Sequence, residues 1–169
     1  MANPYYDGRI QLDGNGYPVQ GLYPFMSKKV VTFAGGTADA WGDDGGALDG
    51  GTLFTVTGVV KCIVVAKCTT SCTGAGSTNE VGISGATAIF MPTTTMTNLD
   101  AGHIWLNNAT PATCCVVGES GAAADNLPVY MLNGNDIIMT TKTANTEAGV
   151  VEFYCYWTPI SSDASVVAA

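Results

Sequence analysis

The stretch GTLFTVTGVVKCIVVAKC, residues 51–68, carries the pattern that decides the fold class of the chain. Apolar side chains occupy its even positions, namely Phe54, Val56, Val60, Cys62, Val64 and Ala66. The opposite set of positions holds Lys61, Ile63, Val65 and Lys67. A repeat of two residues is that of a β-strand, in which successive side chains point to opposite faces. The stretch therefore predicts a central strand with its even positions turned toward a core.

A second stretch, GVVEFYCYWTP at residues 149–159, shows the same alternation. One face consists of Val151, Phe153, Cys155 and Trp157, and the other of Glu152, Tyr154, Tyr156 and Thr158. Both stretches are rich in β-branched and aromatic residues, which fit a pleated surface. We expect the two strands to be partners at the centre of one core.

Shorter alternating runs separated by turn-forming residues predict the remaining strands. They are Val30–Ala34, Glu80–Ser84, Ala86–Met91, Gly102–Leu106, Ala112–Val117, Val129–Leu132 and Asp136–Thr143. No segment has the period of an amphipathic helix, and 169 residues suit a single domain. The prediction is an all-β sandwich with jelly-roll-like topology. We expect the last residues, 161–169, to extend onto a neighbour.

Composition points to a protein whose surface is covered by partners. Hydrophobic residues make up 47% of the chain and charged residues only 12%, about half the share usual in a soluble domain. A soluble monomer clothed in Thr, Ser, Asn and Gly is the alternative. The net charge is −8, and the basic residues form no cluster larger than Lys28-Lys29, so we expect no nucleic-acid partner.

The chain is expected to carry neither an export signal nor a membrane span. Its first residues, MANPYYDGRI, lack the cationic start and apolar region of a secretory signal. No run of about 18 apolar residues is present that could cross a bilayer.

Six cysteines are many for such a chain. Cys62 and Cys155 fall on the apolar faces of the two strongest strands, where free cysteine is a common core residue. Cys68 and Cys72 could form a local disulfide or contribute to a zinc site. Adjacent Cys114 and Cys115 would point to opposite faces of a strand, which favours the disulfide over zinc; we predict no metal and no cofactor.

Residues 35–51 form a Gly/Asp-rich loop that leaves two interpretations open. Asp39, Asp43, Asp44 and Asp49 could gather around calcium, since hard cations take clustered carboxylates. Their spacing does not match an EF-hand, and Gly and Asp are ordinary turn residues. We favour a structural loop, with Trp41 packed against the core or a neighbour.

Residues 1–29 differ from the rest, with four of the seven tyrosines and three of the seven prolines. This composition predicts an extended N-terminal arm that lies on another protein, followed by a β-sandwich domain at 30–169; a frayed tail is the alternative. Tyrosine offers a large contact area at low entropic cost, and arginine can bind a carboxylate through two hydrogen bonds. The predicted partner-binding residues are Tyr5, Tyr6, Arg9, Tyr17, Tyr23 and Phe25.

Catalysis has little support, so we do not expect an enzyme. His103 is the only histidine, and no serine-hydrolase, metalloprotease or phosphate-loop motif is present. We expect His103 to be a surface or packing residue. The glutamates at 80, 119, 147 and 152 are scattered, which leaves a paired-carboxylate glycosidase as the one enzymatic alternative.

Six segments, in order, resemble the small structural proteins encoded beside the capsid genes of tailed double-stranded DNA phages. They are VVTFAGG (30–36), TLFTVTG (52–58), EVGISGATA (80–88), AGHIW (101–105), NGNDII (133–138) and FYCYWTPIS (153–161). They are spread over most of the chain, from residue 30 onward. The first 29 residues and the number of cysteines depart from this family's pattern.

The resemblance implies a virion structural protein, namely a head decoration or cement protein. Such a protein would be made in the host cytoplasm, bind the major capsid protein at the capsid surface and form a homo-oligomer, expected to be a trimer. The alternative is a carbohydrate- or receptor-binding module of a head or tail fibre. In that module Trp41, Trp105, Tyr154 or Tyr156 would be exposed and stack on a sugar.

Overall fold

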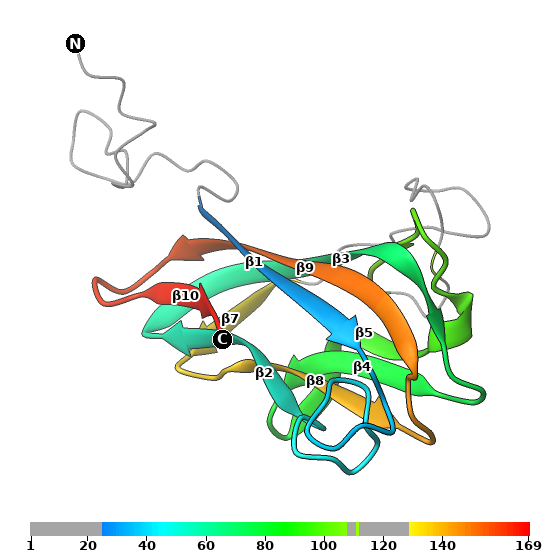
Figure 1. Cartoon of the computed structure of the whole chain (residues 1–169). Helices are drawn as coiled ribbons and strands as arrows, with labels where there is room; N and C mark the ends of the chain where they lie inside the picture. The colour runs from blue at the N-terminus through cyan, green and yellow to red at the C-terminus, as the bar shows by residue number, and fades with distance from the viewer. Residues whose placement is uncertain (1–24, 108–110, 112–128) are drawn as a thin grey trace.

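Two antiparallel β-sheets pack face to face in the computed structural model, which describes residues 25–107, 111 and 129–169 (Figure 1). The first sheet has the order β1-β9-β3-β6, with β7 also paired to β3. Its strands are β1 (Phe25–Phe33), β9 (Ala148–Pro159), β3 (Val59–Thr73), β6 (Ile104–Trp105) and β7 (Tyr130–Asn133). The all-β sandwich predicted from the sequence is confirmed.

The second sheet has the order β10-β2-β8-β4-β5. Its strands are β10 (Ser165–Ala168), β2 (Gly51–Thr57), β8 (Ile137–Lys142), β4 (Thr78–Ile83) and β5 (Ala86–Thr95). A short 3-10 helix, η1 (Met96–Asn98), follows β5. In the part of the chain that the structure describes, no helix is long and apolar enough to cross a bilayer.

Strand pairs are nested around the β4–β5 hairpin. Moving outward from it, β3 pairs with β7, β2 with β8 and β1 with β9. Within the first sheet, β9 also pairs with β3 and so joins the β1–β9 pair to the β3–β7 pair. Within the second sheet, β8 also pairs with β4 and so joins the β2–β8 pair to the β4–β5 pair.

The stretch 51–68 is two strands rather than one, and this corrects the sequence prediction. Gly58 adopts a left-handed conformation with φ of 63°, and the chain crosses there from β2 in one sheet to β3 in the other. Phe54 and Val56 face the core from the second sheet, while Val60 and Cys62 face it from the first. The six apolar residues predicted to face inward are therefore all buried, because the alternation reports which side faces inward and not which sheet the strand joins.

Strands β3 and β9 are partners, as predicted, and form the centre of the first sheet. Cys62 lies opposite Trp157 and Val64 opposite Cys155. The face Val151, Phe153, Cys155 and Trp157 is buried in the core. Trp105 from β6 packs beside this face, with its ring edge-on to that of Phe153 at a distance of 6.0 Å between ring centroids.

The first strand begins at Phe25, five residues before the predicted start at Val30. Residues 25–29, assigned from the sequence to the arm, pair in register with β9 from Trp157 to Phe153. Lys28 and Lys29 interrupt the apolar alternation, which hid this half of the strand. Adjacent lysines suit a strand at the edge of its sheet, where charge discourages unwanted pairing.

The other predicted strands match β4 to β8 with small shifts of their ends, except Ala112–Val117, which lies outside the described residues. The tail predicted to reach a neighbour instead contains β10, which pairs with the chain's own β2 from Ser165 to Ala168. Because β2 then has partners on both sides, it is an interior strand of the second sheet.

Candidate interaction face

The outer surface of the first sheet is built from side chains of β1, β9, β3 and β7 that point away from the core. The register aligns them in rows across the strands: Met26, Tyr156 and Ile63; Lys28, Tyr154 and Val65; Val30, Glu152 and Lys67; and Thr158, Lys61 and Met131. We call this surface the outer face. It lies on the opposite side of these strands from the buried core, so the central strands carry apolar residues on both sides.

Exposed apolar side chains concentrate on the outer face. Met26 is 53% exposed, Val30 49% and Met131 69%, and Val129, which directly precedes β7, is 48% exposed. Among the described residues, the other large hydrophobic side chains so exposed are Ile160 and Val167. Apolar and tyrosine side chains grouped on one exposed sheet face are typical of a protein-binding surface.

One charged cluster crosses the outer face between its apolar residues. Lys28 Nζ lies 2.7 Å from Glu152 Oε1, and the Tyr154 hydroxyl donates to Glu152 Oε2 at 2.5 Å. Lys28 Nζ also lies 5.4 Å from the centre of the Tyr154 ring. Hydrogen bonds from Lys28 and then Tyr154 lower the pKa of Glu152, and the hydrogen bond to Glu152 raises the pKa of Lys28 and that of Tyr154. The cluster fixes the rotamers of three side chains at the middle of the face.

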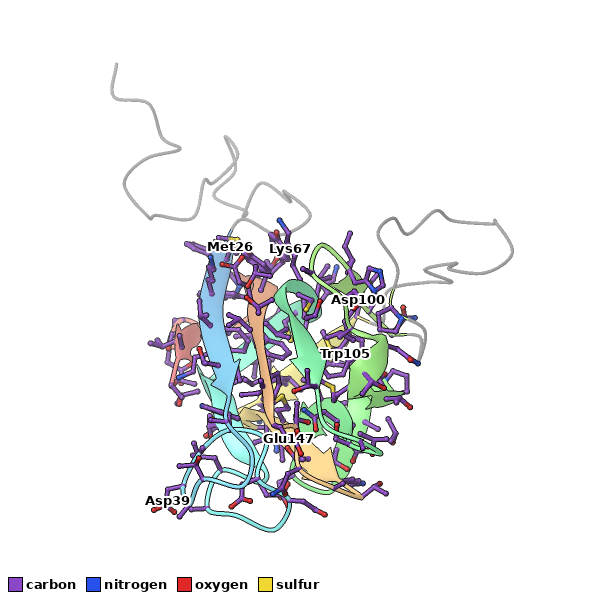
Figure 2. All side chains as sticks on the ribbon, turned by 45° about the vertical axis from the view of Figure 1, so that its right-hand side comes forward. Met26, Asp39, Lys67, Asp100, Trp105 and Glu147 are labelled. Carbon is purple, nitrogen blue, oxygen red and sulfur yellow. The ribbon has the colours of Figure 1, made fainter. Side chains whose placement is uncertain are left out.

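The outer face is basic in an acidic protein. Lys28, Lys61 and Lys67 contribute three positive charges and Glu152 one negative charge, a sum of +2, whereas the chain as a whole carries −8. Several acidic side chains lie in the loops at the other end of the sandwich, where Figure 2 shows Asp39 and Glu147; Asp100, by contrast, lies toward the end that holds Met26 and Lys67.

The Gly/Asp loop predicted between 35 and 51 is held by hydrogen bonds within the protein. Asp49 accepts from the backbone N–H of Thr141 at 3.0 Å and from that of Gly45 at 3.1 Å. No group of three or more His, Cys, Asp or Glu side chains among the described residues could hold a metal ion. Trp41 packs against the core as predicted, with Lys29 Nζ 5.9 Å from its ring centre.

The cysteines at 62, 68, 72 and 155 are free and buried. Cys62 and Cys155 lie in the core as predicted, while the disulfide favoured for Cys68 and Cys72 is not formed. The Cys68 thiol instead donates to the carbonyl oxygens of Thr70 at 3.1 Å and Leu99 at 3.4 Å. Burial raises the pKa of Cys68 and of Cys72, which keeps both as neutral thiols. Cys114 and Cys115 lie outside the described residues.

The aromatic residues proposed for sugar stacking differ in burial and lie in different parts of the fold. Trp105 is fully buried and donates its indole N–H to the Thr94 hydroxyl at 3.0 Å, so it presents no ring to solvent. Trp41 is half-buried against the core. Tyr154 and Tyr156 remain, and they lie on the outer face.

The titratable residues considered for catalysis are spread over different surfaces. Glu152 lies on the outer face of the first sheet, Glu80 is buried in β4 of the second sheet, and Glu147 is exposed in the loop before β9. Glu119 lies outside the described residues. His103 is a turn residue, with its Nδ1 3.0 Å from the Asn98 carbonyl oxygen.

Of the predicted partner-binding residues, Tyr5, Tyr6, Arg9, Tyr17 and Tyr23 lie outside the described residues. Phe25 lies in β1, where its ring stacks on Trp157 at 4.7 Å between centroids. The outer face was not predicted as a site, although its signal was present in the second apolar set of each long stretch: Ile63 and Val65 in one, Tyr154 and Tyr156 in the other.

Comparison with protein-family models, with curated proteins and with solved structures finds no match to this chain. Function is therefore inferred from the chain's own residues.

Proposed function

We propose that the chain is a virion structural protein of a tailed phage, a head decoration or cement protein that binds the major capsid protein. The observation that supports a place in a protein assembly is the outer face, a sheet surface with exposed Met26, Val30 and Met131 and the Lys28–Glu152 ion pair, which suits it to contact with a neighbouring subunit. A sheet that is apolar on both sides is suited to being covered by protein. The ordered resemblance to phage head proteins supplies the biological setting.

We further propose that the sandwich is a jelly roll. The nested pairs β1–β9, β2–β8, β3–β7 and β4–β5 support this assignment. Jelly rolls occur in viral capsid proteins and also in lectins, so the fold class alone does not separate the two functions.

Protein binding is favoured over sugar binding by the state of the aromatic residues. Trp105 is buried, and the Tyr154 hydroxyl is already bound to Glu152. A sugar platform would need exposed rings with free polar groups beside them. A non-enzymatic role is part of the same proposal, since the described glutamates lie in different places: Glu80 is buried in the second sheet, Glu152 lies on the outer face of the first, and Glu147 lies in the loop before β9.

In this proposal residues 1–24 are the segment that reaches the capsid. They precede β1 directly, so they leave the domain where Phe25 and Met26 border the outer face. Their tyrosines and Arg9 are the predicted contacts.

Co-sedimentation with empty capsids tests the proposal. Full-length protein is compared with a truncation that begins at Phe25, which preserves the whole of β1; a truncation beginning at Val30 would remove half of that strand. We expect full-length protein to bind at a fixed ratio to capsid subunits and the truncation to lose binding. If neither form binds, the decoration role is wrong, and binding to a glycan array would then favour the fibre module.

A further inference from the structure

We propose that the outer face of one copy binds the acidic end of a second copy, so that copies join head to tail into a closed ring. The acidic end is defined by Asp39, Asp43, Asp44 and Glu147. The inference rests on the proposed role of a self-associating head protein, and it names the two surfaces through which the copies associate.

The acidic end is a fixed platform made of two loops. Gly35 N–H donates to the Thr146 carbonyl at 2.9 Å, and Thr146 N–H donates to the Gly42 carbonyl at 2.8 Å. Asp44 N–H donates to Asn145 Oδ1 at 2.8 Å. These bonds join the loop after β1 to the loop before β9, so the carboxylates project from a cross-linked backbone and lose little freedom on binding.

Charge favours contact between the outer face and the acidic end over contact between two outer faces. Two outer faces placed against each other would bring a sum of +2 against +2, which opposes association. The four carboxylates of the acidic end match the basic outer face instead. The two surfaces lie apart on the molecule: Figure 2 shows Asp39 and Glu147 at one end and Met26 and Lys67 at the other, so one copy can offer both at once.

Symmetry favours the same arrangement. An interface between two different surfaces of the same chain is heterologous, and it closes into a ring when the rotation between copies is right. A trimer with three-fold symmetry has only such interfaces. Each copy in the ring would use its outer face once and its acidic end once, which leaves residues 1–24 of every copy for the capsid.

The area of the outer face indicates how tightly two copies should bind through a single contact. Each of its twelve positions occupies about 4.8 Å by about 6.7 Å, so the outer face spans about 390 Å². Stable interfaces bury about 800 Å² on each partner, so a single contact should be weak and dependent on concentration. Ring closure gives each copy two contacts at once and makes assembly cooperative.

Analytical ultracentrifugation of the full chain tests the proposal with two variants. The face variant carries Lys67→Glu and Met131→Glu, and the end variant carries Asp44→Lys and Glu147→Lys; all four side chains are exposed. Asp39 is left unchanged because its φ of 62° is unfavourable for lysine. Val167→Glu, also exposed but on β10 of the second sheet, is the matched control. Circular dichroism verifies that every variant is folded.

We expect wild-type protein and Val167→Glu to form the same small oligomer, which dissociates as salt is raised. Each of the two variants alone should associate at least about tenfold more weakly. Their equal mixture should associate again, because the face variant keeps an intact acidic end, the end variant keeps an intact outer face, and the two reversed surfaces carry opposite charge.

Three results would overturn the inference: wild-type protein that stays monomeric at its solubility limit, a mixture that does not associate, or a face variant that assembles as wild type does. Capsid co-sedimentation of the same variants separates this inference from the proposed function. Variants that bind capsid as monomers would leave the decoration role intact, and an oligomer that ignores capsid would refute the role but not the interface.

Discussion

Glu80 in β4 and Lys142 in β8 form an ion pair whose carboxylate is buried. Lys142 Nζ lies 2.5 Å from Glu80 Oε1, and the Glu80 side chain is 2% exposed while that of Lys142 is 46% exposed. The Thr93 hydroxyl donates to Glu80 Oε2 at 2.6 Å. Lysine and threonine therefore cover the carboxylate on the outer side of the second sheet.

This arrangement predicts how stability depends on pH. Burial disfavours the charged form of Glu80, but hydrogen bonds from Lys142, Thr87 and Thr93 outweigh it, and the pKa lies below the ordinary 4.5. The folded state therefore binds a proton less readily than the unfolded state. The stabilisation is present at neutral pH, above the unfolded pKa, and is lost as pH falls through the folded pKa.

Glu80→Gln should lower the free energy of unfolding at pH 7 by about 2 kcal/mol. It should also flatten the loss of stability on acidification. Urea unfolding at a series of pH values from neutral to strongly acidic measures both effects. Glu147→Gln, in an exposed loop, is the control and should change the free energy of unfolding at pH 7 little. Curves for Glu80→Gln and wild type that coincide would mean that the pair does not stabilise the fold.

Gly58 should be intolerant of any side chain. Its φ is 63°, and an added Cβ would lie 2.5 Å from both Asp163 Oδ1 and Ser161 Oγ. Ser161 Oγ also accepts the Val59 N–H at 2.8 Å, so displacing it breaks the turn that leads into β3. Gly58→Ala should cost about 3 kcal/mol, combining a strained backbone with a lost hydrogen bond.

Gly45→Ala is the matched control for this substitution. Its φ is 73°, but an added Cβ would meet nothing within 4 Å. Only the backbone strain remains, at a cost of about 1 kcal/mol. Thermal or urea unfolding of the two variants side by side checks the difference; equal losses would show that the crowding at Gly58 relaxes without cost.

Gly58 also marks the limit of what the sequence predicts here. Alternation identifies the inward side chains of residues 51–68, because side-chain direction is a local property of a strand. The step from one sheet to the other depends on the conformation of one glycine. From the sequence alone, Gly58 is equally compatible with a turn and with the interior of a strand that it would weaken. The first half of β1 was hidden for a related reason: Lys28 and Lys29 are adjacent, and only pairing with β9 shows that the strand continues.

The outer face could not be predicted as a unit because its members come from separate segments of the chain. Met26 and Lys28 precede the core strands, Ile63 and Val65 lie on β3, and Tyr154 lies on β9. Each segment shows a second apolar set, but the rows exist only once the order β1-β9-β3 and its register are known. The nested strand order likewise depends on contacts between distant segments, which leave no local mark.

The buried cysteines should be unreactive in the folded protein. Burial and then the neighbouring Cys68 raise the pKa of the Cys72 thiol, and contact with Cys62 and then burial raise that of Cys155. Thiol reagents attack the thiolate, which these sites disfavour. Cys72 also packs directly against Gly149: a Cβ added at Gly149 would lie 2.6 Å from Cys72 Sγ.

A thiol-reactive chromogenic reagent measures this in a chain carrying Cys114→Ser and Cys115→Ser, which leaves the four described cysteines. We expect no native labelling, and labelling of all four after denaturation. Native labelling of Cys68 or Cys72 before unfolding would contradict the buried, neutral state assigned to these thiols.

Phe25 should act as a residue of the sandwich rather than of the arm. Its ring is nearly parallel to that of Trp157, at 22°, and the Trp157 indole N–H donates to Ser27 Oγ at 3.2 Å. Ser27 Oγ in turn donates to the Val166 carbonyl at 2.6 Å, which ties β1 to β10 of the other sheet. Phe25→Ala removes the stacked ring from this cluster and should lower the free energy of unfolding by about 2 kcal/mol.

The matched control for Phe25→Ala is Val30→Ala, on the exposed side of the same strand, which should change stability little. Urea unfolding and capsid co-sedimentation of both variants distinguish the two roles of Phe25. Lower stability with unchanged capsid binding assigns Phe25 to the sandwich. Weaker capsid binding at unchanged stability would return Phe25 to the arm, because a ring that stabilises the fold by stacking on Trp157 cannot be removed without a loss of stability.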